Sequence, residues 1–360
     1  MAEQRFLVVR LGSLGDIVHT FPAVSALRES FPQAEIIWLT QERWKPLVAS
    51  SGLASKIWVT DTRKFPVLVK TIREIRAQQF TTAIDYQGLW KSASLPFLAG
   101  VPRRIGFSSE SIREAGVPLL YTDSVHAIST HVADQNGELS KLAGTRDPVA
   151  PFALQLSPMA DDALFKFLCS RNVDRYLVLS PGGGWRSKCW PAERFGALCQ
   201  LITDSLDCKC IVNHGPGEED LGAQVRAASG EAGPLLFNGE FAPLMSLLRN
   251  ALCMVGGDTG PLHLAAALGT PVIAMFGPTD PARNGPYHVA EPASENIGTL
   301  PGANASLTEK AKSNIPHDIV FRAPNVVTTH SRSEVTHPSM LEIQVDAVFD
   351  AVRRTVQARG

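Results

Sequence analysis

The sequence lacks net charge, cysteines in its first half and long apolar runs, and each shortage excludes a class of protein. Its 360 residues carry 34 Lys and Arg against 35 Asp and Glu, so no overall positive field recruits nucleic acid. The six cysteines lie between Cys169 and Cys253 and match no zinc or disulfide spacing. We therefore expect a cytoplasmic protein with reduced thiols and no nucleic-acid partner.

The apolar runs are too short for a targeting or membrane segment. The run Phe6 to Val9 ends at Arg10, which argues against a signal peptide. The longest stretch without formal charge, residues 259–279, is interrupted by Pro261, Pro271 and Pro278. We expect no membrane span, so any membrane contact would be peripheral.

The sequence instead contains short apolar runs that alternate with helical patterns, which is typical of parallel sheets covered by helices on both faces. In the first half, strands are expected over 5–11, 35–39, 56–59 and 82–86, and helices over 17–30, 43–51 and 67–78. In the second half, strands are expected over 176–180, 209–213, 235–237, 253–255 and 271–275, and helices over 192–204, 218–228 and 242–250.

This pattern predicts an α/β protein with two Rossmann-like doubly wound domains that face each other across a cleft. The predicted domains are 1–150 and 159–340, joined by a proline-rich linker over 144–158. Periodicity disappears between 290 and 338, which predicts an irregular insertion, and 341–360 is expected to add a C-terminal amphipathic helix.

The first strand is followed by the turn Gly12-Ser-Leu-Gly-Asp-Ile-Val-His-Thr20, which is not a dinucleotide fingerprint. Asp16 is either the N-cap of the next helix or a general base facing the cleft. A helix N-terminus favours the ionised carboxylate, so such a base would take its proton late in the reaction. His19 could orient Asp16, although packing in the core is the simpler interpretation.

The second half contains two turns suited to a diphosphate. In Ser180-Pro-Gly-Gly-Gly-Trp-Arg-Ser-Lys188, glycines allow close approach while Arg186 and Lys188 bring charge. In Gly256-Gly-Asp-Thr-Gly-Pro-Leu-His263, a helix start offers free N–H groups beside an acidic residue. The predicted donor-binding residues here are Gly183, Gly184, Arg186, Lys188, Asp258, Thr259, Gly260 and His263.

A third turn, His214-Gly-Pro-Gly-Glu-Glu-Asp220, ends in acidic residues that are ordinary helix caps. Glu218 or Glu219 could instead bind ribose hydroxyls, as acidic residues do in other doubly wound domains. The sequence contains no Asp-x-Asp triplet, so we expect no metal and no other cofactor. Lys188, Arg186 and helix N-termini would then neutralise the leaving group.

Four ordered blocks resemble the bacterial heptosyltransferases of lipopolysaccharide core assembly: 12–20, 85–92 (Asp-Tyr-Gln-Gly-Leu-Trp-Lys-Ser), 188–191 (Lys-Cys-Trp-Pro) and 257–263 with 277–280. The resemblance implies a GT-B fold and metal-independent, inverting transfer. The donor would be ADP-heptose and the acceptor a lipid-linked oligosaccharide, the lipid A–inner core. The protein would be cytoplasmic and peripheral on the inner face of the inner membrane. The 290–338 stretch departs from the family pattern.

The resemblance also implies residue roles. Asp16 matches the catalytic base, Lys188 the lysine on the donor phosphates, and Asp258 the residue near the sugar hydroxyls. The predicted acceptor site comprises Arg10, Gly15, Gln87, Lys91 and Arg63, the last within a basic cluster over 63–76. Other interpretations remain: transfer of another activated sugar or to another acceptor, including protein, a nucleotide-sugar epimerase, or a non-catalytic sugar-nucleotide-binding scaffold.

Overall fold

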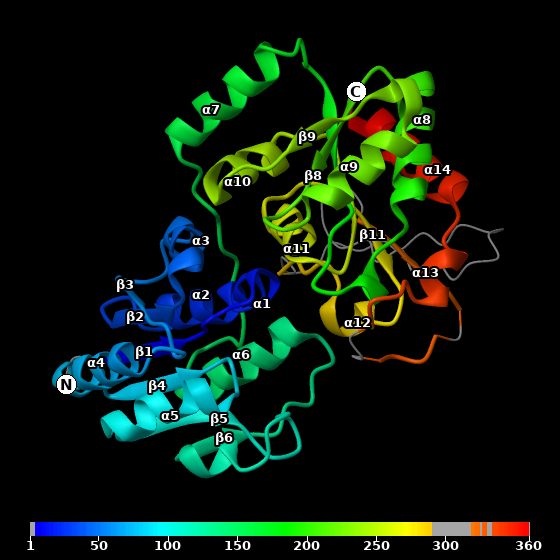
Figure 1. Ribbon diagram of the computed structural model, residues 1–360. Helices are drawn as coiled ribbons and strands as arrows, with labels where there is room; N and C mark the ends of the chain where they lie inside the picture. The colour runs from blue at the N-terminus through cyan, green and yellow to red at the C-terminus, as the bar shows by residue number, and fades with distance from the viewer. Residues whose placement is uncertain (1–3, 290–317, 325, 330–332, 360) are drawn as a thin grey trace. The chain divides into compact units, whose positions relative to one another are not determined.

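The computed structural model describes residues 4–289, 318–324, 326–329 and 333–359 (Figure 1). By contacts between Cα atoms the chain divides into unit 1, Met1–Gln155, and unit 2, Leu156–Gly360. Each unit has a parallel six-stranded sheet with helices on both faces, which confirms the predicted fold class. Among the described residues, none of the helices has the length and apolar content that a bilayer crossing requires.

Unit 1 has strand order β3-β2-β1-β4-β5-β6. Its strands are β1 Arg5–Val9, β2 Glu35–Thr40, β3 Lys56–Val59, β4 Thr82–Asp85, β5 Arg103–Phe107 and β6 Asp123–Val125. Its helices are α1 Leu14–Val18, α2 Phe21–Ser30, α3 Lys45–Ser50, α4 Phe65–Ala77, α5 Trp90–Ala99 and α6 Val132–Ala143, with short 3₁₀ turns η1 Glu42–Trp44 and η2 Val117–Leu120.

Unit 2 has strand order β12-β11-β10-β7-β8-β9. Its strands are β7 Tyr176–Ser180, β8 Lys209–Asn213, β9 Leu235–Phe237, β10 Met254–Gly257, β11 Val272–Phe276 and β12 Ile319–Arg322. Its helices are α7 Pro158–Cys169, α8 Ala192–Ser205, α9 Glu219–Ala228, α10 Phe241–Arg249, α11 Gly260–Ala267, α12 Pro281–Asn284, α13 Pro338–Glu342 and α14 Val345–Arg359, with 3₁₀ turns η3 Arg186–Lys188 and η4 Gly230–Ala232.

The predicted helix over 17–30 was wrong as a single element, because the chain forms α1 and α2 with a break at His19 and Thr20. Pro22 lies in the first turn of α2, where its missing N–H and fixed φ are tolerated. In the interior of one long helix the same proline would remove a hydrogen bond and clash with the preceding turn. The break directs the chain from the Asp16 turn into α2.

The irregular insertion predicted over 290–338 was also wrong in part. Residues 290–317 lie outside the described residues, but Ile319–Arg322 form β12 and pair in parallel with β11. Ile319 and Phe321 point into the core of unit 2. The predicted C-terminal helix begins at Val345, and its buried residues Val348 and Val352 belong to that same core.

Candidate active site

In each sheet, the two central strands are the point from which the chain adds strands in opposite directions: β1 and β4 in unit 1, and β7 and β10 in unit 2. The turns that carry the predicted site residues follow these strands. In unit 1, β1 lies between β2 and β4, and the turns after β1 and β4 carry Asp16 and Gln87. In unit 2, β7 lies between β8 and β10, and the segments after β7 and β10 carry Lys188 and Asp258. Doubly wound sheets bind ligands at such switch points, outside the carboxyl ends of the strands.

Asp16 lies in the first turn of α1 with its side chain 42% exposed. The prediction that Asp16 is the N-cap was wrong, because Ser13 caps the helix and Asp16 is three residues further on. Asp16 Oδ2 accepts hydrogen bonds from the Ser13 backbone N–H at 3.1 Å and from its hydroxyl at 3.0 Å. This capping geometry satisfies backbone donors at the helix start and fixes the carboxylate in an accessible position.

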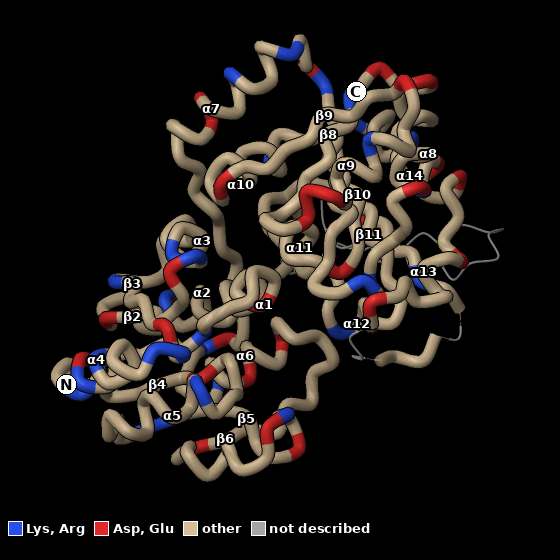
Figure 2. The backbone as a smooth tube through the Cα atoms, viewed as in Figure 1, with Lys and Arg blue, Asp and Glu red and all other residues tan. Residues whose placement is uncertain are grey.

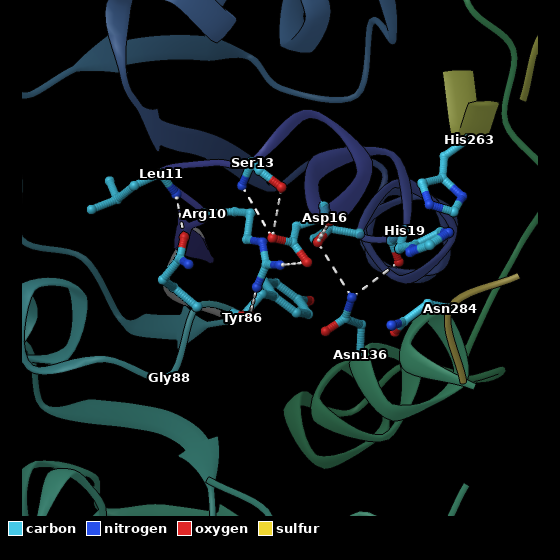
Figure 3. A network of polar contacts seen from close by, with 12 residues as sticks. Arg10, Leu11, Ser13, Asp16, His19, Tyr86, Gly88, Asn136, His263 and Asn284 are labelled. Carbon is cyan, nitrogen blue, oxygen red and sulfur yellow. Dashed lines mark hydrogen bonds and ion pairs between the residues drawn. The ribbon is translucent and has the colours of Figure 1, made fainter. Parts of the chain in front are cut away.

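Arg10 holds the other oxygen of Asp16. Its guanidinium contacts Asp16 Oδ1 at 2.7 Å and donates to the backbone carbonyl of Tyr86 (Figure 3). The Arg10 side chain is only 7% exposed, so it is held inside unit 1 between β1 and the end of β4. In this structure Arg10 orients Asp16; its predicted contact with an acceptor stays a prediction.

Gln87 belongs to the same cluster, because its Oε1 accepts the backbone N–H of Leu11 at 3.1 Å. The turn that carries Gln87 is organised by the buried carboxylate of Asp85. Asp85 accepts from the backbone N–H of Gln87 and from the hydroxyls of Ser92 and Tyr121, at 2.8–2.9 Å. Burial raises the pKa of Asp85 despite these hydrogen bonds. Sequence reasoning included Asp85 in a motif but missed this supporting role.

The other predicted acceptor residues are less closely connected. Gly15 is buried within α1, next to Asp16. Lys91 is exposed at the start of α5, the helix that follows the Gln87 turn. The Arg63 side chain is 84% exposed and forms an ion pair with Asp61 at 3.0 Å. His19 is buried and packs edge-on against His131, with 5.1 Å between ring centroids.

Lys188, Asp258 and His263 form the second cluster, within unit 2. Lys188 Nζ contacts Asp258 Oδ2 at 2.6 Å, and His263 Nε2 shares a hydrogen bond of 3.2 Å with Asp258 Oδ1. Burial by itself raises the pKa of Asp258, but the hydrogen bond with His263 and the charge of Lys188 outweigh it and hold that pKa well below its usual range. Asp258 is therefore an ionised, nearly buried carboxylate.

Two features bring Lys188 to this position. Gly257 ends β10 where a Cβ would come within 3.0 Å of the Lys188 carbonyl, so the absent side chain lets the two segments pass closely. The ammonium also lies 4.3 Å from the ring centroid of Trp185, a cation–π contact that sequence reasoning missed. Lys188 is thus held by an aromatic face and a carboxylate near the start of α11.

Buried polar atoms without partners mark the same edge of unit 2. Thr259 Oγ1, Thr279 Oγ1 and His214 Nδ1 make no hydrogen bond to the described residues. They follow the carboxyl ends of β10, β11 and β8 respectively. Because unpaired buried polar groups are unfavourable, three of them along one sheet edge indicate a place where a polar ligand supplies the missing hydrogen bonds.

The remaining predicted donor residues surround this edge. Gly183 is half-buried, while Gly184 and Arg186 are exposed. Glu218 lies against Gly182 and accepts the Gly215 N–H at 2.9 Å, whereas Glu219 is exposed. Gly260 is the first residue of α11, after its N-cap Thr259. Among the described residues, no group of three or more His, Cys, Asp and Glu side chains is arranged to hold a metal ion.

Two Rossmann-like units, each with a polar cluster at the switch point of its sheet, define the fold class of the protein, GT-B. The chain is similar over 99% of its length to the crystal structure of the glycosyl transferase family 9 protein of Veillonella parvula DSM 2008, with a TM-score of 0.80, 20% identity and 98% of that chain covered. It is likewise similar to E. coli ADP-heptose lps heptosyltransferase II, with a TM-score of 0.78, 18% identity and 99% of both chains covered.

The family model described as glycosyltransferase family 9 (heptosyltransferase) matches residues 68–311. The chain belongs to this family and is a glycosyltransferase. It is 29% identical over 304 residues to lipopolysaccharide heptosyltransferase 1 of Escherichia coli strain K12. The matched region covers 79% of this chain and 91% of that protein. The resemblance inferred from the four sequence blocks is thereby confirmed.

Proposed function

We propose that this chain transfers a heptose from ADP-heptose to a hydroxyl of a lipopolysaccharide inner-core acceptor, with inversion at the anomeric carbon. Asp16 is the general base in this proposal. The observation that carries it is the accessible carboxylate of Asp16, with one oxygen held by Arg10 and the other by Ser13. Similarity to lipopolysaccharide heptosyltransferase 1 and to ADP-heptose lps heptosyltransferase II supports this choice of donor and acceptor.

In the proposed reaction, the acceptor oxygen attacks the anomeric carbon from the face opposite ADP. The new C–O bond forms as the bond to the diphosphate oxygen breaks, the hydroxyl proton passes to Asp16, and ADP leaves with the bonding electrons. Positive charge at the donor comes from Lys188, Arg186 and the N-terminus of α11, without a metal. Thr259 supplies a hydroxyl that has no partner among the described residues.

The acceptor is anchored in lipid, so we also propose peripheral contact between this protein and the cytoplasmic face of the inner membrane. Domain roles follow the clusters: unit 1 carries the base and binds the acceptor, and unit 2 binds the activated sugar.

Calorimetric titration of the full chain with ADP, UDP and GDP in EDTA tests the donor. Selective ADP binding is expected, whereas preference for UDP or GDP would replace heptose by another activated sugar. Incubation with ADP-heptose and the lipid A–inner core acceptor then tests transfer, and the anomeric configuration of the product tests inversion. ADP binding without transfer to any acceptor would favour a sugar-nucleotide-binding scaffold. Activity that disappears with EDTA and returns with Mg²⁺ would contradict the metal-free mechanism.

A further inference from the structure

Unit 1 exposes large apolar side chains on neighbouring elements, α4, α5 and η2. Phe65 and Leu119 are 73% and 83% exposed, and Trp90, Phe97 and Leu98 are between 42% and 49% exposed. A group of exposed apolar side chains on neighbouring elements, unlike scattered single residues, marks a surface that contacts something other than water.

These side chains form one surface because α4 and α5 are parallel neighbours. Arg76, near the end of α4, donates to the carbonyls of Leu98 and Ala99 at the end of α5. The starts of both helices, with Phe65 and Trp90, therefore lie at the carboxyl edge of the sheet, the edge at which Asp16 follows β1.

η2 continues this surface. The Trp90 ring lies against Gly116, where a Cβ would be 3.0 Å from Cζ2 of Trp90, and Gly116 directly precedes η2. Arg104 lies 5.5 Å from the ring centroid of Phe97 and donates to the Leu120 carbonyl. We call the exposed apolar residues Phe65, Trp90, Phe97, Leu98 and Leu119, with the charged residues around them, the α4–α5 surface.

The charges of the α4–α5 surface are mostly positive, although the whole chain has a net charge of -1. Its basic members are Lys70, Arg73, Arg76, Lys91 and Arg104. Figure 2 shows blue segments, which mark Lys and Arg, on α4. Its acidic members are two. Glu74 lies 3.7 Å from Lys70, and Glu114 accepts the backbone N–H of Trp90 at 2.7 Å. Five basic and two acidic side chains leave an excess of positive charge.

We propose that the α4–α5 surface binds the anionic phospholipid surface of a membrane. Aromatic and leucine side chains enter the boundary between head groups and acyl chains, and lysines and arginines pair with anionic head groups. This inference rests on the proposed function, in which a lipid-anchored acceptor has to reach Asp16. Contact through Phe65 and Trp90 brings the carboxyl edge of unit 1, with Asp16, to the bilayer.

Co-sedimentation of the full chain with vesicles tests the surface. We expect binding to phosphatidylcholine vesicles with about 30% phosphatidylglycerol, weak binding to phosphatidylcholine alone, and loss of binding as salt rises well above about 0.1 M. Each basic residue near an anionic surface contributes about fivefold to binding, so Lys70→Glu with Arg73→Glu should weaken it by about 25-fold or more. Phe65→Ser with Leu119→Ser should also weaken binding at low salt, because it removes the side chains that enter the boundary between head groups and acyl chains.

Matched control variants carry the same chemical changes elsewhere. Met159→Ser with Phe165→Ser alters two apolar residues on α7 that are 82% and 67% exposed. Lys166→Glu with Arg354→Glu reverses two exposed charges in unit 2. Both controls should bind vesicles as the wild type does. Equal loss in controls and α4–α5 variants, or no binding by the wild type, overturns the proposed surface. A wild-type dimer that Phe65→Ser with Leu119→Ser converts to a monomer, without vesicle binding, would assign the surface to a second copy instead.

Transfer assays separate this inference from the proposed function. The α4–α5 variants should transfer heptose normally to a deacylated, water-soluble acceptor and poorly to the acceptor embedded in vesicles. Equal transfer to both acceptors by these variants overturns the membrane role. Absence of wild-type transfer to either acceptor, with vesicle binding intact, would overturn the proposed function and leave the membrane surface supported.

Discussion

At the scale of single residues, the candidate site contains two carboxylates whose oxygens are held by different partners. Asp16 is accessible, and Arg10 and Ser13 orient its carboxylate and favour the ionised form, so the proposed base takes its proton late in the reaction. Asp258 is nearly buried and is fixed by Lys188 and His263, so it is suited to holding cations and hydroxyls in place. The two environments lead to different expectations for the substitutions Asp16→Asn and Asp258→Asn, each of which replaces a carboxylate by an amide of the same shape.

Asp16→Asn removes the proposed base but keeps the shape of the side chain. We expect the rate of transfer to fall by about 10²–10⁴-fold, the usual contribution of a general base. ADP affinity should be unchanged because Asp16 belongs to unit 1, whereas the proposed nucleotide site belongs to unit 2. Steady-state kinetics and calorimetry measure both. Asp147→Asn, an exposed position in the same unit, is the control, and equal rates for both variants would exclude Asp16 as the base.

Asp258→Asn should lower stability in a pH-dependent way. The pKa of Asp258 is held below its usual range in the folded protein, so its ion pair contributes fully above the unfolded value of about 3.9 and is lost as pH falls below it. The difference in Tm between wild type and Asp258→Asn should therefore be constant from about pH 8 to 5 and should shrink below about pH 4. A difference that grows on acidification would contradict this assignment.

Thr259→Val replaces a buried hydroxyl, which has no hydrogen-bond partner in the described part of the chain, by a methyl group of similar size. Removing an unsatisfied polar group should stabilise the unliganded protein by about 1 kcal/mol. Donor binding should weaken by about fivefold to tenfold if the ligand supplies the missing hydrogen bond. Thermal unfolding and ADP-heptose titration measure the two effects. Unchanged donor affinity would remove the Thr259 hydroxyl from the donor site.

At the scale of elements, sequence periodicity missed the strands β5, β6 and β12. β5 begins with Arg103 and Arg104, which break the apolar run. In the structure Arg103 pairs with Asp123 of β6, and Arg104 stacks on Phe97 of α5. β12 escaped prediction because it is short and follows a long polar stretch. Each is stabilised by neighbours distant in sequence, which a local pattern does not register.

α14 gives a prediction at this scale because it completes the core of unit 2. Val352 is fully buried there, whereas Arg354 is exposed on the same helix. Val352→Asp places a charge in the core and should destabilise the protein by about 3 kcal/mol or more. Arg354→Ala should change stability by less than about 0.5 kcal/mol. Chemical denaturation compares the two, and similar midpoints would show that α14 is not part of the core.

At the scale of the whole molecule, each unit has its own sheet and its own hydrophobic core. Chains with several domains often unfold in more than one step. We expect ADP to raise the temperature of the transition that Val352→Asp lowers, because the proposed nucleotide site and α14 both belong to unit 2. At about 100 times its Kd, ADP should add about 2.7 kcal/mol. Scanning calorimetry tests this, and a shift confined to the other transition would assign the nucleotide to unit 1.

The amino-acid sequence by itself determined the fold class, the family and the turns that carry the candidate site. Alternating apolar runs and glycine-rich turns are local features, and they are legible along the chain without knowledge of its folding. Tertiary structure decided what those turns do. Arg10 reaches Tyr86, Gln87 reaches Leu11, and Lys188 reaches Asp258 across 70 or more residues of sequence. Those contacts arise because parallel strands bring their carboxyl ends to one edge of the sheet, where residues that are distant in sequence lie close together in space.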